Sequence, residues 1–277
     1  MKHLAELRLP EDLPAASRAE LQAVLARAPG VRPPLEELWQ LMDDAWDELG
    51  LDNRRPDPDL LARFYRHPVW TLNGLYTEQD PESIAHRKAV AEWLRAHAAG
   101  TRLRVLDLGG GFGMLARLLS ERGMAVHVLE PYPTELGRAR LAGLADAKYI
   151  TAPEGAYDAL VAMDVLEHVP DPAATLVEAA GAVRPGGVLV FQNHFAPAIK
   201  CHLPGNFHLN EGFGQLAWLC GLTAIGRVEG SYASAWRKAR ERRPSRGMLA
   251  AFGLWSRGYS RARRAVRRAA GLLRSRP

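Results

Sequence analysis

The residues with the clearest chemical pattern follow a short apolar run, in the segment RVLDLGGGFGMLARLL. Asp107 ends the run, and Gly109, Gly111 and Gly113 follow at every second position. Glycine tolerates positive φ and lets a ligand approach the backbone closely. A helix predicted to begin near Phe112 offers unpaired N–H groups at its start. The segment therefore predicts a site for a nucleotide-type ligand at the carboxyl end of a buried strand.

The spacing of these residues fits two kinds of cofactor site. Gly111, Gly113 and Ala116 satisfy the dinucleotide pattern G-x-G-x-x-G/A, which alone is weak evidence. Asp107 and the three glycines satisfy the longer pattern D-x-G-x-G-x-G, and Glu130 could hold ribose hydroxyls in either case. The carboxylate of Asp107 favours the longer pattern, because it suits an ammonium group and would repel a pyrophosphate. A glycine turn without any ligand is the least favoured interpretation.

Short apolar runs alternate with helical segments between residues 103 and 236. Strands are expected at Arg104–Leu108, Val126–Glu130, Ala159–Met163 and Val188–Phe191, and helices after Phe112, around Thr134–Leu141, from Pro172 to Val183 and near Glu211–Leu219. This alternation predicts an α/β fold, with a doubly wound, mostly parallel sheet and helices on both faces. Residues 222–230 and 231–238 are expected to close the sheet as an antiparallel pair.

Two further segments extend the pattern, YDALVAMDVLEHVPDP and VRPGGVLVF. With D-x-G-x-G-x-G, they resemble class I S-adenosylmethionine (SAM) dependent methyltransferases, especially the branch of ubiquinone-type O-methyltransferases and natural-product methyltransferases. The resemblance covers residues 103–236, roughly half of the chain. It implies a Rossmann-like fold with a seven-stranded sheet and SAM as the cofactor, but it does not specify the acceptor.

The resemblance also implies which residues contact the cofactor. The glycines line its methionine and ribose portions, the first aspartate lies near its amino group, and the glutamate binds the ribose hydroxyls. A second aspartate and a valine close over the methionyl side. These residues are Asp107, Gly109, Gly111, Gly113, Glu130, Asp164 and Val165. The segment ITAPEGAYD is shorter than the family's usual stretch, and Glu154 is its candidate for an acidic contact to the adenine.

A proton acceptor is expected after the fourth strand, where the resemblance places the methyl-transfer site. Methyl transfer needs an oriented nucleophile, exclusion of water and, for a hydroxyl, removal of a proton. His168 is the candidate base, because histidine titrates near working pH, and Glu167 is an orienting or second polar group. A structural role for His168, capping the loop or pairing with Asp171, is the competing interpretation.

Acceptor contacts are expected from two places in the chain. Asn193 and His194 follow the fifth strand and would face the same crevice. Trp70, Asn73 and Tyr76 precede the helix that leads into the sheet, and in similar enzymes the N-terminal segment forms a lid over cofactor and acceptor. Simple packing of the helical part onto the sheet explains these three residues equally well.

No metal site is predicted from the cluster His194, Cys201, His202 and His208. These residues lie within 15 positions, but their spacing matches no zinc signature. Some ubiquinone-type relatives use a divalent ion near the Glu-His pair, and this sequence does not establish such a site.

Residues 1–100 are predicted to be mostly helical. Ser17 and Glu20 form a capping box that opens a helix, which is expected to stop near Pro29. A second helix follows in PLEELWQLMDDAWDELG, where apolar residues recur on one face. Asp57 and Asp80 each precede a proline and are expected to be N-caps. The segment HPVWTLNGLYTEQD shows no helical period and is expected to be an ordered loop.

The composition is that of a folded globular protein. Of 277 residues, 47% are apolar and 24% charged, which excludes wholesale disorder, a collagen-like repeat and a disulfide scaffold. No apolar stretch approaches the ~18–20 residues that span a bilayer. The start MKHLAELRLPEDLP lacks the apolar core of a secretory signal. Cys201 and Cys220 are therefore expected to be reduced thiols in a cytoplasmic protein.

A strongly basic segment ends the chain. Residues 237–277 contain 14 Lys or Arg residues and one acidic residue, so their formal charge is +13. Because the whole chain has a net charge of +5, residues 1–236 carry −8. Apolar residues recur there at alternating spacings of four and three, which predicts a basic amphipathic helix with an apolar seam. The seam consists of Met248, Phe252, Trp255, Tyr259, Ala262, Val266, Ala269 and Leu273.

Several surfaces could receive this helix, over residues 245–273. Packing on its own domain with solvated arginines is the first interpretation, and an anionic membrane is the next favoured, because Phe252, Trp255 and Tyr259 share the apolar side and ubiquinone-type relatives handle lipid acceptors. In the membrane case, the protein would be peripheral at the inner face of the membrane. A groove on a partner protein remains open. Nucleic acid is disfavoured, because the body is acidic and carries no recognised RNA-binding module.

The sequence thus predicts three parts: a helical lid and substrate region over 1–100, a SAM-binding methyltransferase domain over 101–236, and a basic amphipathic tail over 237–277. The expected function is SAM-dependent methylation of a small molecule, at oxygen, in specialised or lipid-linked metabolism. Three alternatives are a SAM-using enzyme with another outcome, an NAD(P)-dependent oxidoreductase and a non-catalytic SAM-binding partner protein. The oligomeric state is not predicted.

Overall fold

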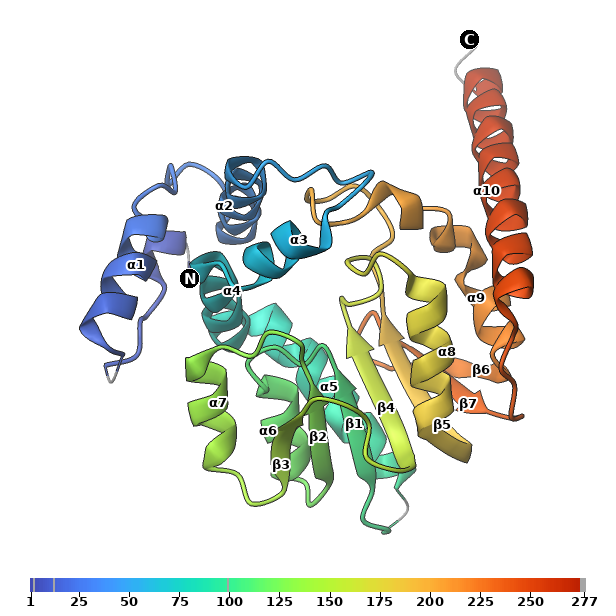
Figure 1. Ribbon diagram of the computed structural model, residues 1–277, viewed down its shortest axis with the longest axis horizontal. Helices are drawn as coiled ribbons and strands as arrows, with labels where there is room; N and C mark the ends of the chain where they lie inside the picture. Colours follow the sequence, from blue (N-terminus) through green and yellow to red (C-terminus); the bar gives the residue numbers. More distant parts are fainter. Residues whose placement is uncertain (2, 12, 99, 275–277) are drawn as a thin grey trace.

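The computed structural model describes residues 1, 3–11, 13–98 and 100–274. In this part of the chain, seven strands form one sheet: β1 Arg104–Leu108, β2 Ala125–Leu129, β3 Ala147–Ile150, β4 Tyr157–Met163, β5 Val183–Gln192, β6 Leu222–Arg227 and β7 Ser234–Lys238. Their order is β3-β2-β1-β4-β5-β7-β6 (Figure 1). Strands β1 to β5 are parallel, and β7 is antiparallel to β5 and β6.

This topology confirms the predicted doubly wound fold and the antiparallel closing pair. The chain runs outward from β1 to β2 and β3, and then returns to place β4 on the other side of β1. The carboxyl ends of β1 and β4 therefore flank the point where the winding direction reverses. In open α/β sheets, ligands bind in the crevice at this point.

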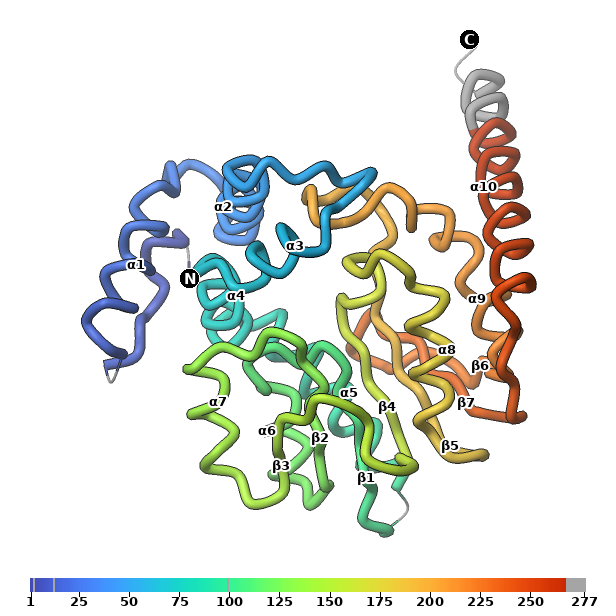
Figure 2. The backbone as a smooth tube through the Cα atoms, in the orientation of Figure 1, coloured from blue at the N-terminus to red at the C-terminus, as the bar shows by residue number. Residues whose placement is uncertain are grey.

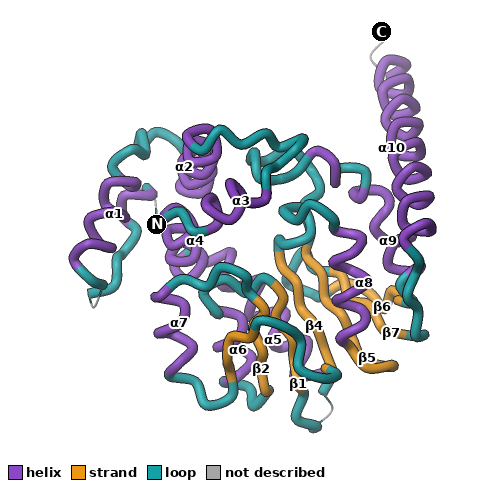
Figure 3. The backbone as a smooth tube through the Cα atoms, in the orientation of Figure 1, coloured by secondary structure: helices purple, strands orange, loops and turns teal. Residues whose placement is uncertain are grey.

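Helices cover both faces of the sheet (Figure 3). They are α5 Pro81–His97, α6 Met114–Ser120, α7 Glu135–Ala142, α8 Pro172–Ala182 and α9 Leu209–Leu219. Because strand side chains alternate between faces, Val105 of β1 packs with α5, α6 and α7. Its neighbour Leu106 packs with α8 and α9 on the opposite face. On each face of the sheet, the hydrophobic core is made of the apolar runs from which the strands were predicted.

The connection from β3 to β4 spans only residues 151–156 and contains no helix. Parallel strands are usually joined by a dozen residues or more, commonly including a helix. Without one, Leu106, Leu108 and Leu129 line a groove of about 350 Å³ beside α8. This is the segment that the sequence already marked as short.

Four helices and a short 3-10 turn, η1 Leu4–Glu6, form the front of the molecule. The helices are α1 Ala15–Leu25, α2 Pro34–Glu48, α3 Pro58–Tyr65 and α4 Pro68–Gln79. They share a core with Phe112 of the glycine segment and with Ile199 and Cys201, which follow β5. The front therefore packs above the ends of the parallel strands, where the arrows of β4 and β5 end (Figure 1).

The predicted N-caps at Asp57 and Asp80 are confirmed. The Asp57 carboxylate accepts hydrogen bonds from the backbone N–H groups of Asp59 and Leu60, at 2.9 and 3.0 Å. The Asp80 carboxylate accepts from the N–H of Ser83 at 2.8 Å. Each satisfies donors that a helix start leaves unpaired.

Helix α4 corrects the sequence analysis, which expected an ordered loop in this segment. The ring of His67 accepts a hydrogen bond from the N–H of Val69 at 3.2 Å, and Pro68 occupies the first turn. The helix packs against α1, α2 and α5, and Gly74 lies against the ring of Phe112. A helix that is covered on several sides has no clear polar face, so its period was hidden.

The capping box predicted at Ser17 is also wrong. Helix α1 begins at Ala15, follows Pro14, and has no side-chain cap, so Ser17 lies inside its first turn. The preceding proline fixes the chain direction at this start instead. The helix ends at Leu25, a few residues before the predicted stop near Pro29.

Residues 237 and 238 of the predicted tail belong to strand β7, so the tail starts later than predicted. Its helix is α10, Arg246–Arg274, which runs beside α9 and then extends away from the body (Figure 2). Phe252, Ser256 and Ser260 are buried at its base, whereas Met248, Trp255 and Val266 are exposed. The side chains of Ala269 and Leu273 lie outside the described part of the helix. In the described chain, no helix combines the length and apolar character needed to cross a membrane.

Candidate cofactor and acceptor site

The glycine loop between β1 and α6 depends on backbone angles that other residues adopt at a cost. Gly109, Gly111 and Gly113 have φ values of 65°, 52° and 78°. A Cβ on Gly109 would lie 2.6 Å from Cγ2 of Val165. A Cβ on Gly110 would lie 2.4 Å from Oδ2 of Asp107. The loop is therefore folded tightly against both predicted neighbours, and only residues without a side chain fit there.

Asp107 lies beneath this loop and is 2% exposed. Its Oδ2 atom is buried and has no hydrogen-bond partner. Burial raises the pKa of its carboxyl group to about 7, and the charge of Arg87 opposes that shift. A buried polar atom without a partner is costly unless a ligand satisfies it. An ammonium group would supply the charge and the hydrogen-bond donors that this carboxylate lacks.

Glu130 stands beside the loop at the end of β2. Its two carboxylate oxygens accept from the N–H of Gly111 at 3.2 Å and from the N–H of Tyr132 at 3.1 Å. Burial raises the pKa of this carboxyl group. Tyr149 on β3 donates its hydroxyl to the carbonyl of Gly111 at 2.6 Å. These bonds fix the carboxylate at the rim of the glycine loop, which is where hydroxyl groups of a ribose could be bound.

Asp164 and Val165 come directly after β4, next to the end of β1. Among the described residues other than glycine, Asp164 is the one with positive φ, at 56°. Such a conformation is strained and is often found at functional sites. Its carboxylate accepts from the side-chain amide of Gln192 at 3.0 and 3.3 Å. The turn thereby holds Val165 against Gly109, so the two loops meet above the strand ends.

Arg87 is a candidate that the sequence analysis missed. It lies on α5, and its positive charge opposes the rise in pKa of both Asp107 and Asp164. Its guanidinium donates to the carbonyl of Ser83 at 3.2 Å, which leaves other donors for a ligand. The sequence around it, AHRKAV, has no distinguishing pattern. Only the packing of α5 against the sheet brings this arginine near enough for its charge to act on both carboxyl groups.

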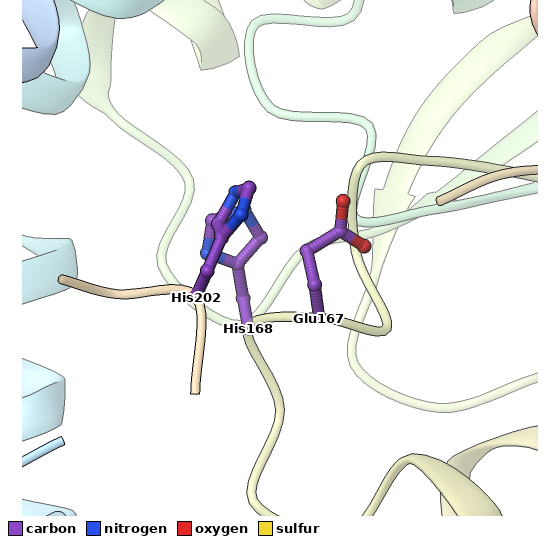
Figure 4. A group of neighbouring side chains, drawn as sticks. All are labelled: Glu167, His168 and His202. Atoms are coloured by element: carbon purple, nitrogen blue, oxygen red, sulfur yellow. The ribbon is translucent and has the colours of Figure 1, made fainter. Parts of the chain in front are cut away.

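Glu167 and His168 lie in the loop after β4 (Figure 4). Glu167 is fully buried, and its Oε1 accepts from the N–H of His194 at 2.8 Å. Burial, and then the charge of Asp164, raise its pKa to about 8. Burial, and then the charge of His202, lower the pKa of His168 to about 3. At neutral pH the carboxyl group is mostly protonated and the imidazole is neutral.

The figure also shows that Glu167 and His168 do not point toward each other (Figure 4). The ring of His168 instead lies against that of His202, with centroids 4.8 Å apart. The Nδ1 atom of His168 and the Oε2 atom of Glu167 are buried and have no hydrogen-bond partner. Both atoms therefore keep a hydrogen-bonding capacity that no described side chain or backbone group satisfies. The proposed orienting role of Glu167 toward His168 has no hydrogen bond to support it.

Glu167, His168 and His202 also bring three potential metal ligands within 4.8 Å of one another. Two imidazoles and one carboxylate are a donor set that zinc accepts. However, one carboxylate oxygen already accepts from His194, and the raised pKa of Glu167 favours its uncharged form. His202 also uses its Nδ1 for a hydrogen bond of 2.9 Å with the carbonyl of Ala196. The Nδ1 bond of His202 leaves its Nε2 free for a ligand, and Oε2 of Glu167 has no partner among the described residues, so the three side chains could hold a divalent ion when Glu167 is ionised.

Of the predicted acceptor residues, Trp70 is the one that contacts the candidate base. Its ring meets that of His168 edge-on at 6.1 Å, and its buried Nε1 has no partner. Tyr65 of α3 lies against Trp70 and stacks on Tyr132, at 5.0 and 5.9 Å between centroids. Aromatic side chains from the front helices thus reach the strand ends. Tyr65 and Tyr132 were not predicted, because they belong to unrelated segments of the chain.

The other predicted acceptor residues differ in their surroundings. Asn193 has a buried carbonyl oxygen without a partner, and His194 is exposed beside the ring of His202. Asn73 is half-buried on α4. Tyr76 is 6% exposed and packs in the core of the front helices. Packing accounts for Tyr76 without an acceptor.

Glu154 lies in the short connection between β3 and β4. Its carboxylate pairs with Lys148 at 2.8 Å, and its N–H donates to the hydroxyl of Tyr157 at 3.1 Å. The side chain is about half exposed. Its ion pair with Lys148 competes with the contact to an adenine that the sequence analysis considered.

The comparisons with known proteins match the part of the chain that carries this site. A family model described as a methyltransferase domain matches residues 76–240, which include α5, the glycine loop, the loop after β4 and the closing pair of strands. The chain belongs to this methyltransferase family. The resemblance to class I SAM-dependent methyltransferases is thereby confirmed.

Two curated relatives of the methyltransferase domain are named ubiquinone biosynthesis O-methyltransferase. The one from Xylella fastidiosa is 28% identical over 161 residues, covering 53% of this chain and 63% of the relative. The one from Burkholderia pseudomallei is 36% identical over 151 residues, covering 49% of this chain and 62% of the relative. The chain therefore spans less than two thirds of the length of either relative.

A solved structure shares the fold of the methyltransferase domain and its surroundings. It is an O-methyltransferase family protein from Burkholderia thailandensis, with a TM-score of 0.53 and 16% identity. The match covers 75% of this chain and 71% of that protein. It supports the Rossmann-like arrangement.

Proposed function

We propose that this protein transfers the methyl group of SAM to an oxygen atom of a small molecule. The observation that carries the proposal is a set of buried polar atoms without hydrogen-bond partners on adjoining elements at the strand ends. Such atoms call for a ligand. They are Asp107 Oδ2, Glu167 Oε2, His168 Nδ1, Asn193 Oδ1 and Trp70 Nε1. The names of the curated relatives favour oxygen as the methylated atom.

The cofactor half of the site lies around β1 and β2. Asp107 would bind the ammonium group of SAM, Arg87 its carboxylate, and Glu130 its ribose hydroxyls. The glycine loop and Val165 would enclose the chain between these groups. When bound, SAM supplies an electrophilic methyl group on its sulfonium. A carboxylate and a guanidinium in one site match both charges of an amino-acid group.

The acceptor half lies around His168, Asn193 and Trp70. We assign His168 as the acceptor of the hydroxyl proton, because its imidazole is neutral at pH 7 and its Nδ1 is free. Its low pKa makes it a weak base, so it takes the proton as the oxygen bonds to the methyl group, when the hydroxyl becomes strongly acidic. The front helices α1 to α4, within the predicted lid region 1–100, would act as the lid that excludes water, with the ring of Trp70 beside the acceptor.

The function is tested by incubating the protein with SAM and a panel of small phenols and alcohols. We expect one acceptor to gain the mass of a CH2 group while S-adenosylhomocysteine accumulates in equal amount. His168→Ala should lower turnover by about 100-fold or more while affinity for S-adenosylhomocysteine is retained. Reduction of NAD⁺ with the same panel, without methylated product, would sink the assignment.

We also propose that α10 places the protein at an anionic membrane surface, peripheral to its inner face. Arg257, Arg261 and Arg264 are exposed on this helix, and no acidic residue follows Glu241. Trp255 is 47% exposed. A cationic helix with exposed apolar residues suits a surface that offers both negative charge and an apolar interior. Nucleic acid is less favoured because residues 1–236 carry a net charge of −8, and a partner groove stays an alternative.

A further inference from the structure

Asn206 connects two segments that form the acceptor half of the site. It ends the short 3-10 turn η2 Pro204–Asn206, between β5 and α9, and it is 4% exposed. Its side-chain nitrogen lies 2.9 Å from the carbonyl oxygen of Val169, 3.2 Å from that of Glu167 and 3.4 Å from that of Leu166. One buried amide thus serves three carbonyl groups of the loop after β4.

That loop has no regular secondary structure between β4 and α8. Its carbonyl groups therefore need partners from elsewhere. The N–H of Leu203 donates to the carbonyl of Glu167 at 3.0 Å, and the hydroxyl of Tyr65 lies 3.4 Å from the carbonyl of His168. Among these donors, the side-chain amide of Asn206 lies near the largest number of carbonyl groups of the loop. Its three acceptors also fix which end of the amide carries the nitrogen.

We propose that Asn206 is a positioning residue for the acceptor site. Its amide holds the backbone on both sides of Glu167 and His168, and so directs Nδ1 of His168 and Oε2 of Glu167 toward the acceptor. The inference rests on the proposed methyl transfer at this pair. Asn206 touches neither the glycine loop nor Glu130, so it acts on the acceptor side of the reaction and leaves cofactor binding unchanged.

Two substitutions at Asn206 test this role. Asn206→Leu keeps the size of the side chain and removes its donors. Asn206→Asp keeps the shape of the side chain but places an oxygen where the amide nitrogen was. This oxygen can donate a hydrogen bond to the carbonyls only when the new carboxyl group is protonated. Asn210→Asp, on an exposed position of α9, is the matched control.

We expect both Asn206 variants to lower kcat at pH 8 by about tenfold or more, with affinity for S-adenosylhomocysteine unchanged within about twofold. Asn206→Asp should regain activity as the pH falls, whereas Asn206→Leu should not. Asn210→Asp should match the unmodified protein. The inference is overturned if kcat is unaffected, if affinity falls in step with kcat, or if the two variants share one pH profile.

Hydrogen exchange gives a readout that does not depend on activity. Asn206→Leu should increase exchange in peptides covering 164–170 and 192–206 while peptides covering 104–113 stay unchanged. If the unmodified protein methylates no acceptor, the proposed function fails, and the exchange result still decides whether Asn206 holds the loop. Unchanged exchange in 164–170 would overturn the inference.

Discussion

Asp107 and Glu167 are both buried carboxyl groups whose pKa values are raised, to about 7 and about 8, mainly by burial. Each retains an oxygen without a partner. A folded protein that keeps such groups gives up stability for them, because charging them in the interior is unfavourable. Ligand binding is the simplest reason for both. Asp107 would stay charged beside Arg87 and a bound ammonium, whereas Glu167 has no cation of its own.

The raised pKa of Glu167 predicts a loss of stability with increasing pH. The folded state binds the proton more tightly than the unfolded state, so the stability that this proton provides is lost as the pH rises from 4.5 to about 8. Glu167→Gln cannot lose a proton in this range. We therefore expect the Tm of Glu167→Gln minus the Tm of the unmodified protein to be several degrees larger at pH 8 than at pH 5. The thermal melts are recorded in the presence of a chelator. If the difference in Tm between the two proteins is the same at pH 5 and pH 8, the raised pKa of Glu167 is contradicted.

Glu130 provides a second prediction at the scale of single residues. Replacing it with Gln removes the charge of the proposed ribose contact, so affinity for S-adenosylhomocysteine should fall by about 10- to 100-fold. Glu135→Gln, at an exposed position of α7, should have no effect. Calorimetric titration compares the two. Equal affinities would remove Glu130 from the site.

At the scale of elements, the strand ends bring two loops together. Gly109 and Val165 come from the loops after β1 and β4, and the missing Cβ of Gly109 makes their contact possible. Each loop depends on an unusual backbone conformation, at the glycines in one case and at Asp164 in the other. The site therefore depends on how these loops fit as much as on the side chains they carry.

Gly109→Ala tests this fit. The added Cβ would meet Val165 at 2.6 Å and would also be strained by φ of 65°. Gly123→Ala is the matched control, since its φ is 78° and no atom lies within 4 Å of the added Cβ. In denaturant unfolding, Gly109→Ala should lose about 1–3 kcal/mol more unfolding free energy than Gly123→Ala does. Only Gly109→Ala should weaken binding of S-adenosylhomocysteine. Equal losses of unfolding free energy in the two variants would contradict the close contact between Gly109 and Val165.

The local patterns of the sequence predicted most elements of the sheet domain. Residues 104–108 were assigned correctly as β1, because buried parallel strands are short apolar runs bounded by turns. Helix α4 was missed because its contacts on several sides blur its period. Arg87, Tyr65 and Tyr132 were missed for another reason: each lies far in sequence from the residues it meets. Such long-range contacts leave no mark in local spacing.

The whole molecule divides its charge unequally. Residues 1–236 carry −8 and residues 237–277 carry +13, of which residues 246–274 contribute eight arginines and no acidic residue. An anionic surface therefore attracts α10 and repels the body. Met248, Trp255 and Val266 are spaced by seven and eleven residues, about two and three helical turns, and share one exposed side. The opposite side is held by Ser260, which donates to Glu211 at 2.9 Å. The helix can therefore meet a surface without leaving α9.

Vesicle sedimentation tests this orientation. We expect binding to vesicles of equal parts phosphatidylglycerol and phosphatidylcholine, little binding to pure phosphatidylcholine, and weaker binding at high salt, because salt screens the arginines. Trp255→Ser should weaken binding several-fold. Trp218→Ser, which removes an exposed tryptophan of α9, is the control. If both variants bind as tightly as the unmodified protein, α10 does not insert its apolar side.

The central claim is that the crevice at the ends of β1 and β4 binds SAM through Asp107. The most direct measurement is calorimetric titration of S-adenosylhomocysteine and of NADH into the unmodified protein, Asp107→Asn and the exposed control Asp59→Asn. The account predicts S-adenosylhomocysteine binding at one site per chain, about tenfold or more weaker binding in Asp107→Asn, and no NADH binding. NADH binding without S-adenosylhomocysteine binding, or equal affinities in all three proteins, would contradict it.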